Sequence, residues 1–143
     1  MSGAAIEAVA LVPGHGEGAP LRLDEPLSFW GGLDPESGEI IDRFHPQKQA
    51  SLAGRTVMMP AARGSSGGSA ALAEAIRLGA GPAAILLLER DPIVAVGALV
   101  AAELYGLECP VALVAAQDWD RLAAAGRLAV KAEGARATIR LEP

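Results

Sequence analysis

Three short apolar runs, separated by segments of helical length, constrain the fold of this chain more than any other feature. The runs cover residues 56–59, 83–88 and 111–114. Each is almost continuously apolar, which is typical of strands that are covered on both faces. Residues 70–78 and 92–105 lie between them, and glycine ends both segments, as it ends many helices. The order strand–helix–strand–helix–strand predicts parallel strands joined by right-handed crossovers.

The two ends of the chain have β character. Residues 6–12 predict one strand and residues 21–23 a short second strand. Residues 127–131 and 136–141 alternate apolar and polar side chains on either side of Glu133-Gly134, which predicts a hairpin. Asp118 is a candidate cap for a short helix that ends near Ala125. We therefore expect one domain over residues 1–143, three-layered α/β, part wound sheet and part small barrel.

Two segments predict loops. Residues 13–20 contain three Gly and two Pro. The long segment (residues 26–49) is irregular, and an irregular loop of this length inside a compact domain is often functional. It carries three of the five aromatic residues, Phe29, Trp30 and Phe44. Because disordered loops rarely hold the largest apolar groups of a chain, we expect the long segment to pack against something.

Composition excludes several classes of protein. A chain of 143 residues that is 51% hydrophobic and 20% charged can bury a core. The net charge of −5 argues against nucleic acid or an anionic membrane as the main partner. The single cysteine, Cys109, excludes an intrachain disulfide and a cluster or zinc site held by cysteines of this chain alone. With no signal peptide and no apolar stretch of about 18 residues, we expect a cytoplasmic protein of a reducing compartment.

The Gly/Ser-rich segment (residues 60–69, PAARGSSGGS) lies between a predicted buried strand and a predicted helix. Unpaired N–H groups and the helix dipole at a helix start favour an anion there. The glycines would let the backbone approach a ligand, and Arg63 adds positive charge. We therefore expect a carboxylate, phosphate or substrate site. The simpler alternative is a turn in which Ser69 caps the helix.

Three familiar motifs do not account for this segment. A P-loop needs Gly-Lys, which the chain lacks. A dinucleotide fingerprint is approached only at residues 14–18, which lead into a proline and a short strand. Residues 64–68 match G-x-S-x-G, but both histidines, His15 and His45, precede Ser66, whereas a nucleophile-elbow hydrolase has its acid and histidine after the serine.

The chain resembles the small subunit of aconitase X across most of its length. The resemblance is carried by motifs at residues 13–18, 26–32, 34–38, 45–47, 52–55, 63–69, 82–85 and 91–93. It implies the swivelling β/β/α fold of the mobile fourth domain of aconitases, with a central, mostly parallel sheet, flanking helices and a small antiparallel part. It also implies a large-subunit partner that holds an iron–sulfur cluster or iron and most of the active site.

The same resemblance implies roles for the Gly/Ser-rich segment. The aconitase serine that takes the substrate proton corresponds to Ser65, so Ser65 becomes the candidate general base. Arg63, Gly64 and Ser66 become candidate substrate-binding residues. Gly67-Gly68 replaces the Arg-Glu of aconitases, which makes a citrate-type tricarboxylate a poor candidate substrate. No metal ligand is expected in this chain.

Two activities are known in this family, and a third possibility is not catalytic. The 28–32 and 43–47 stretches favour the bacterial form, which dehydrates cis-3-hydroxy-L-proline. The alternative is dehydration of mevalonate 5-phosphate. A scaffold or carrier module is the competing class, although a carrier would need a reactive histidine where this chain has serines. We expect His45 to shape a turn and Cys109 to be a small buried residue.

Overall fold

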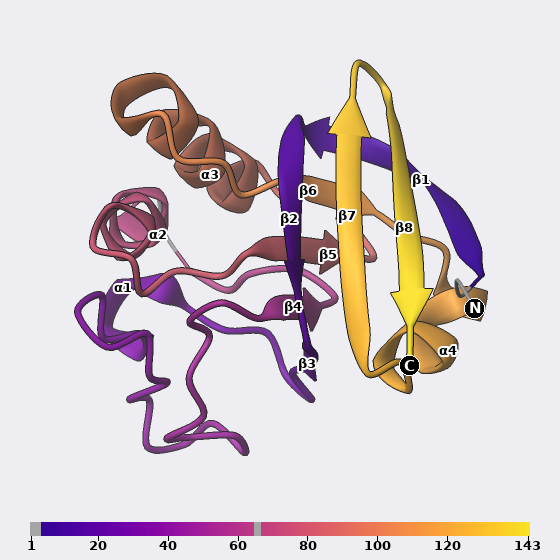
Figure 1. Ribbon diagram of the computed structural model, residues 1–143. Helices are drawn as coiled ribbons and strands as arrows, with labels where there is room; N and C mark the ends of the chain where they lie inside the picture. The colour runs from indigo at the N-terminus through magenta and orange to yellow at the C-terminus, as the bar shows by residue number, and fades with distance from the viewer. Residues whose placement is uncertain (1–3, 65–66) are drawn as a thin grey trace.

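The computed structural model describes residues 4–64 and 67–143, and its strands form one eight-stranded sheet (Figure 1). The order across the sheet is β2-β7-β8-β1-β6-β5-β4-β3. The strands are β1 (Ala5–Val12), β2 (Gly14–Gly18), β3 (Pro20–Arg22), β4 (Thr56–Met59), β5 (Ala84–Leu87), β6 (Val111–Leu113), β7 (Arg127–Glu133) and β8 (Arg136–Glu142). The helices are α1 (Phe29–Gly32), α2 (Gly67–Arg77), α3 (Pro92–Tyr105) and α4 (Trp119–Ala123), with a 3-10 turn over Ala116–Asp118.

The predicted strand–helix–strand–helix–strand centre is confirmed. Strands β4, β5 and β6 pair in parallel, with Ile85 opposite Val57 on one side and Val111 on the other. Strand β3 extends this part in parallel at the edge. The description of the whole sheet as mostly parallel is not confirmed, because β1 runs antiparallel to both β6 and β8 and the β7–β8 hairpin continues the antiparallel pairing to β2. A tight hairpin can join only antiparallel strands, so the C-terminal hairpin fixes this half of the sheet.

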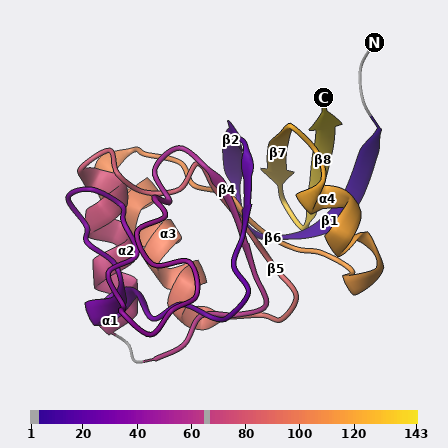
Figure 2. The same ribbon diagram turned by 90° about the horizontal axis from the view of Figure 1, so that it is seen from below.

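The parallel strands lie between two cores. Helices α2 and α3 cover one face, and the strongly bent sheet brings β7 and β8 across the other (Figure 2). Alternate side chains of the strands point to opposite cores: Val57 and Ile85 face the helices, whereas Met58 and Leu86 face β7 and β8. Burial on both faces explains why these strands are apolar at almost every position.

Strand β2 corrects the prediction of a loop over residues 13–20. It pairs antiparallel with β7, from Gly14 opposite Ala132 to Gly18 opposite Leu128. A Cβ atom on Gly16 would lie 2.0 Å from the carbonyl oxygen of Ala83. One on Gly18 would lie 2.2 Å from the carbonyl oxygen of Gly54. The alternating glycines therefore let β2 approach the segments that lead into β4 and β5, and the sheet is nearly closed into a barrel.

The long segment packs on the helix side of the sheet, as expected. Its buried side chains are Leu27, Phe29, Leu33, Ile40 and His45. Within it, α1 is a kinked turn rather than a regular helix, because Gly31 has a φ of 80°. Trp30 and Phe44 are exposed, at 65% and 81%. Phe29 therefore packs inside, and Trp30 packs in part against the start of α2, whereas Phe44 is mostly exposed.

The N-termini of two predicted helices differ from the expectation, one in its position and the other in its cap. Helix α2 begins at Gly67, three residues before the predicted residue 70, so that Gly67, Gly68 and Ser69 belong to its first turn. Helix α4 begins at Trp119, but the side chain of Asp118 makes no capping hydrogen bond. No helix in the described part of the chain has both the length and the apolar composition needed to cross a membrane.

Candidate functional site

The Gly/Ser-rich segment leaves the carboxyl end of β4 and enters α2. Its described residues are 60–64 and 67–69. The predicted base Ser65 and the predicted substrate-binding residue Ser66 lie outside the described residues. The structure therefore places two of the four predicted site residues, Arg63 and Gly64, together with the start of α2.

Gly64 sits against the turn that begins at Ser28. Its φ is 116°, a conformation that side chains other than glycine rarely adopt. A Cβ atom there would also lie 2.8 Å from the hydroxyl oxygen of Ser28. That hydroxyl donates a hydrogen bond to the carbonyl oxygen of Trp30, at 3.0 Å. Both the backbone conformation and the neighbouring serine therefore require glycine at position 64.

The first turn of α2 packs against Phe29, Trp30 and α3. The indole of Trp30 lies over Gly67, where a Cβ atom would be 3.2 Å from the ring. A Cβ atom on Gly68 would lie 3.0 Å from the Cγ2 atom of Ile93 in α3. These two glycines allow close packing of the helix start. Their predicted approach to a ligand stays a prediction.

The main chain of Arg63 is fixed while its side chain is exposed. Its N–H donates to the carbonyl oxygen of Leu27, at 3.0 Å. The guanidinium lies 3.9 Å from the carboxylate of Glu25, and both side chains are more than half exposed. An exposed ion pair of this kind contributes little stability, about 0–1 kcal/mol. Arg63 can therefore turn toward an anionic ligand at low cost.

Ser69 does not cap α2. It lies inside the helix, and its hydroxyl donates to the carbonyl oxygen of Ile93 at 2.8 Å. The simpler reading of the segment, in which Ser69 caps the helix, is therefore wrong. The hydroxyl instead joins the first turns of two helices.

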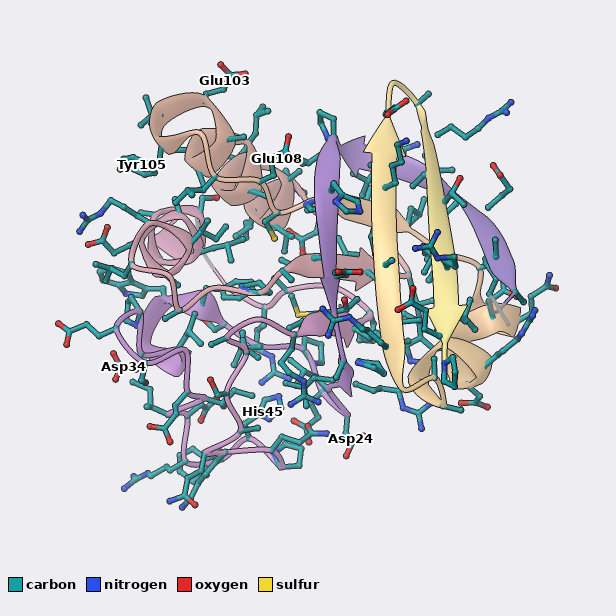
Figure 3. The ribbon with its side chains drawn as sticks, in the orientation of Figure 1. Asp24, Asp34, His45, Glu103, Tyr105 and Glu108 are labelled. Carbon is teal, nitrogen blue, oxygen red and sulfur yellow. The ribbon has the colours of Figure 1, made fainter. Side chains whose placement is uncertain are left out.

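His45 shapes a turn, as expected. It is buried in the long segment, close to the chain that follows β3 (Figure 3). Its Nε2 atom lies 3.0 Å from the carbonyl oxygen of Glu25, and its Nδ1 atom accepts the N–H of Gln47 at 3.0 Å. This arrangement fits the tautomer with the proton on Nε2. The Gln47 amide in turn bonds to main-chain atoms of Arg22 and Asp24. The His45-Pro46-Gln47 motif therefore fastens the long segment to the end of β3.

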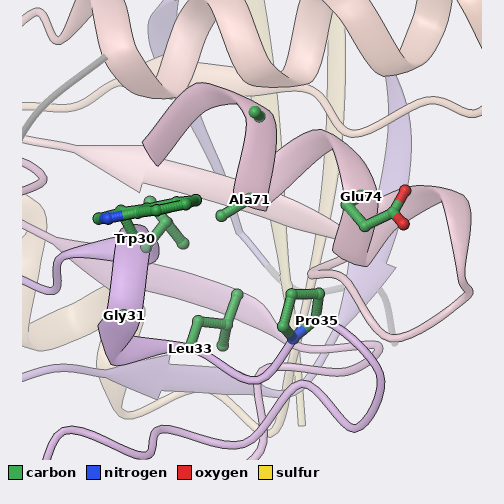
Figure 4. A pocket seen from close by; sticks show the side chains of 8 residues that line it. Trp30, Gly31, Leu33, Pro35, Ala71 and Glu74 are labelled. Carbon is green, nitrogen blue, oxygen red and sulfur yellow. The ribbon is translucent and has the colours of Figure 1, made fainter. Parts of the chain in front are cut away.

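An apolar groove of about 490 Å³ opens beside the start of α2. Figure 4 shows the Trp30 indole beneath the helix, with Leu33 and Pro35 along the facing loop. Glu74 stands at one end, where paired hydrogen bonds from Arg77 lower the pKa of its carboxyl group. Trp30 lines this groove and also contacts Gly67 of the Gly/Ser-rich segment, and the groove faces solvent.

Cys109 is fully buried, and burial raises the pKa of its thiol to about 12. It therefore stays a protonated thiol at neutral pH, whereas a metal ligand must be a thiolate. Within residues 4–64 and 67–143, no three His, Cys, Asp or Glu side chains lie close enough together to hold a metal ion. The described residues do not fit an iron–sulfur cluster.

One contact of the candidate site was not predicted from the sequence. The 28–32 motif packs against the described residues of the Gly/Ser-rich segment. Ser28 meets Gly64, and Trp30 meets Gly67. Asp91 also contacts this segment, since its carboxylate accepts the N–H of Ala62 at 2.7 Å. The only sequence signal was the joint occurrence of these motifs in the aconitase X resemblance.

The bent mixed sheet, the two helices on one face and the glycine-rich entry into α2 define the class of swivelling β/β/α domains. The comparison with known families is specific. The aconitase X swivel domain model matches residues 5–141, and the chain belongs to that family.

Solved structures and curated relatives agree with this assignment. A chain of Thermococcus kodakaraensis aconitase X in its holo-form superposes with a TM-score of 0.80 at 29% identity, covering 96% of this chain and 98% of that one. A cis-3-hydroxy-L-proline dehydratase of Pseudomonas aeruginosa is 49% identical over 120 residues, covering 79% of this chain and 21% of the relative. A phosphomevalonate dehydratase small subunit of Methanothermobacter thermautotrophicus is 41% identical over 88 residues, covering 62% and 67%. The chain thus spans about a fifth of the length of the hydroxyproline dehydratases that it matches.

Proposed function

We propose that this chain is the swivel subunit of a dehydratase that removes water from cis-3-hydroxy-L-proline and yields 1-pyrroline-2-carboxylate. The observation that supports the proposal most strongly is the 49% identity to a protein named for this activity. It agrees with the match of the aconitase X swivel domain model to residues 5–141. The identity to the phosphomevalonate dehydratase small subunit is lower and covers less of the chain.

The reaction breaks two bonds of the substrate. A base takes the proton from the carbon that bears the carboxylate. The electron pair left behind forms a double bond to the neighbouring carbon, and the hydroxyl group leaves from that carbon, with a proton, as water. The resulting enamine becomes 1-pyrroline-2-carboxylate when the nitrogen loses a proton and the carbon that carried the hydroxyl group gains one. The double bond then lies between the nitrogen and the carbon that bears the carboxylate.

In this proposal Ser65 is the base. A serine hydroxyl is a very weak base, so the alkoxide needs oriented amides and positive charge around it. The N-terminus of the 11-residue helix α2 and the exposed guanidinium of Arg63 are the groups of this chain that can supply them. Gly64 and Ser66 would donate hydrogen bonds to the substrate carboxylate.

The proposal requires a second, larger component. The region that matches this chain is about a fifth of the hydroxyproline dehydratases, and the other four fifths lie outside it. We assign the iron–sulfur cofactor and most of the active site to a large-subunit partner, because the described residues of this chain offer no ligand set for a cluster.

The test is Ser65→Ala in the assembled dehydratase. General bases contribute about 10²–10⁴-fold in rate, so kcat should fall at least 100-fold. Assembly and thermal stability should be nearly unchanged, because the change removes a single oxygen. Exchange of the proton beside the carboxylate with deuterated solvent should fall in parallel.

Ser66→Ala is the matched control, since the two variants differ only in which of two neighbouring hydroxyls is lost. If Ser66 binds substrate, its loss should raise KM by about five- to tenfold, which corresponds to about 1 kcal/mol, and should leave exchange measurable. Normal turnover by Ser65→Ala would place the base on the partner and leave this chain the role of a scaffold.

The second candidate function is the phosphomevalonate dehydratase small subunit. It is favoured by a relative of comparable length, of which the match covers 67%. Assays with cis-3-hydroxy-L-proline and with mevalonate 5-phosphate, made on the same preparation, separate the two. Dehydration of the phosphate alone would replace the first proposal with this one.

A further inference from the structure

The Gly/Ser-rich segment is fastened at both of its described ends to one turn of a neighbouring helix. Before Ser65, the N–H of Ala62 bonds to the side chain of Asp91. After it, the hydroxyl of Ser69 bonds to the carbonyl oxygen of Ile93. Both anchors lie at the N-terminus of α3, although they are seven residues apart in the segment.

Asp91 uses its two carboxylate oxygens for different tasks. Oδ1 accepts the N–H groups of Ile93 at 2.9 Å and Val94 at 3.3 Å, which caps α3. Oδ2 accepts the N–H of Ala62 at 2.7 Å. A helix cap needs only one acceptor oxygen, as serine and asparagine show at the same position in other helices. The second oxygen is therefore available to hold the segment.

The second anchor depends on a close approach of α2 and α3. A Cβ atom on Gly97 would lie 2.9 Å from the carbonyl oxygen of Ser69. Glycine at this position lets the first turn of α2 lie against α3, within reach of the Ser69 hydroxyl bond to Ile93. Asp91 itself is only 7% exposed, so water competes little for its hydrogen bonds.

We propose that Asp91 is a positioning residue of the dehydratase. It holds Ala62, on the β4 side of the Gly/Ser-rich segment, against the N-terminus of α3, and it acts on the reaction through the serine that this segment carries. The inference rests on the proposed function. It differs from a role in folding alone, because one oxygen of the same carboxylate serves the helix and the other serves the segment.

Asp91→Asn separates the two tasks. With its oxygen toward Ile93 and Val94, asparagine caps α3 about as well as aspartate. Its NH₂ group then faces the N–H of Ala62, where two donors cannot bond. Site-resolved amide exchange on this chain should show the Ala62 amide exchanging at least tenfold faster, with Ile93 and Val94 changed less than threefold. Unchanged protection of the Ala62 amide would show that the hydrogen bond to Asp91 does not hold the segment.

Turnover by the assembled dehydratase then tests the link to catalysis. Small displacements of a reacting group cost up to about 100-fold in rate, so Asp91→Asn should lower kcat by about 10–100-fold and change KM less than threefold. The double variant Ser65→Ala/Asp91→Asn should be no slower than Ser65→Ala, because the second change acts through a group already removed. Asp34→Asn is the matched control, since among the described residues that carboxylate accepts hydrogen bonds from Glu36 and Ser37 of its own turn alone.

Each outcome separates this inference from the proposed function. If Ser65→Ala impairs turnover and Asp91→Asn does not, the positioning role is overturned and the base assignment stands. A double variant that is slower than Ser65→Ala by the full Asp91→Asn factor would assign Asp91 a structural role only. Normal turnover by Ser65→Ala would overturn the proposed function itself.

Discussion

At the scale of single residues, the buried polar side chains that the structure describes all form hydrogen bonds. Among the described residues, no buried side-chain nitrogen or oxygen atom lacks a hydrogen bond. In this part of the chain, the buried polar and charged residues are His45, Thr56 and Asp91, and each bonds to the main chain. Their bonding partners could not be read from the sequence, because Glu25 is distant from His45 along the chain and Ala62 is distant from Asp91.

Cys109 gives a prediction about reactivity and pH. Iodoacetamide should not modify the folded chain at pH 8 and should add one group per chain after denaturation, since the folded thiol has a pKa of about 12. The unfolded thiol ionises near its ordinary pKa of 9, so above pH 9 the unfolded state releases a proton that the folded state keeps. The free energy of unfolding should then fall by up to about 1.4 kcal/mol for each pH unit between 9 and 12.

The comparison with Cys109→Ala isolates this effect from other groups that titrate at high pH. The variant loses volume and is less stable at every pH, but its slope above pH 9 should be shallower. Equal slopes for the two chains, or alkylation of the folded chain at pH 8, would contradict the prediction.

At the scale of elements, the sequence predicted those strands and helices whose pattern is set by burial or by a turn. The apolar runs gave β4, β5 and β6, and the hairpin alternation gave β7 and β8. Strand β2 was missed because three glycines in five residues suggest a loop. Two of these glycines are needed because the carbonyl groups of Ala83 and Gly54 lie too close for a Cβ atom. Those carbonyl groups come near β2 only in the folded chain, so the sequence does not reveal them.

Gly16→Ala tests that cause. Its Cβ would lie 2.0 Å from the carbonyl oxygen of Ala83, and a shift of β2 away from that oxygen would disturb its pairing with β7. We expect a loss of at least about 3 kcal/mol in the free energy of unfolding, measured by urea denaturation. Gly134→Ala is the control: it lies in the β7–β8 turn with φ of 59° and no atom within 4 Å of its Cβ position, and it should cost only about 1 kcal/mol. Equal losses would show that β2 does not need its glycines for close approach.

At the scale of the whole molecule, the exposed aromatic residues of the long segment are candidates for an interaction surface. Trp30 is 65% exposed and Phe44 81%, whereas Phe29, which is next to Trp30 in the sequence, is buried. Large exposed apolar groups commonly mark an interaction surface. The sequence identified these residues, but only the structure separates the one that packs inside from the two that face outward.

Phe44→Ala should weaken binding to the proposed large subunit and leave this chain equally stable. Removal of an aromatic anchor from an interface often costs about 2 kcal/mol, which is roughly 30-fold in Kd. Isothermal titration of the two subunits measures the affinity, and thermal denaturation of the lone chain checks stability. Leu104→Ala, a 69%-exposed residue near the C-terminal end of α3, is the control. If only the control weakens binding, the partner covers α3 instead.

The parallel strands that separate the two cores have a thermodynamic consequence. Each of β4, β5 and β6 contributes side chains to both cores, so we expect the two cores to unfold together. We therefore expect few partly unfolded states with free energies between that of fraying at the edges and that of complete unfolding. The segment between β4 and α2 is attached to this cooperative unit through its preceding strand. We therefore expect a destabilising substitution in the β7–β8 core to lower the stability of the strand from which the Gly/Ser-rich segment leaves, although the two are far apart along the chain.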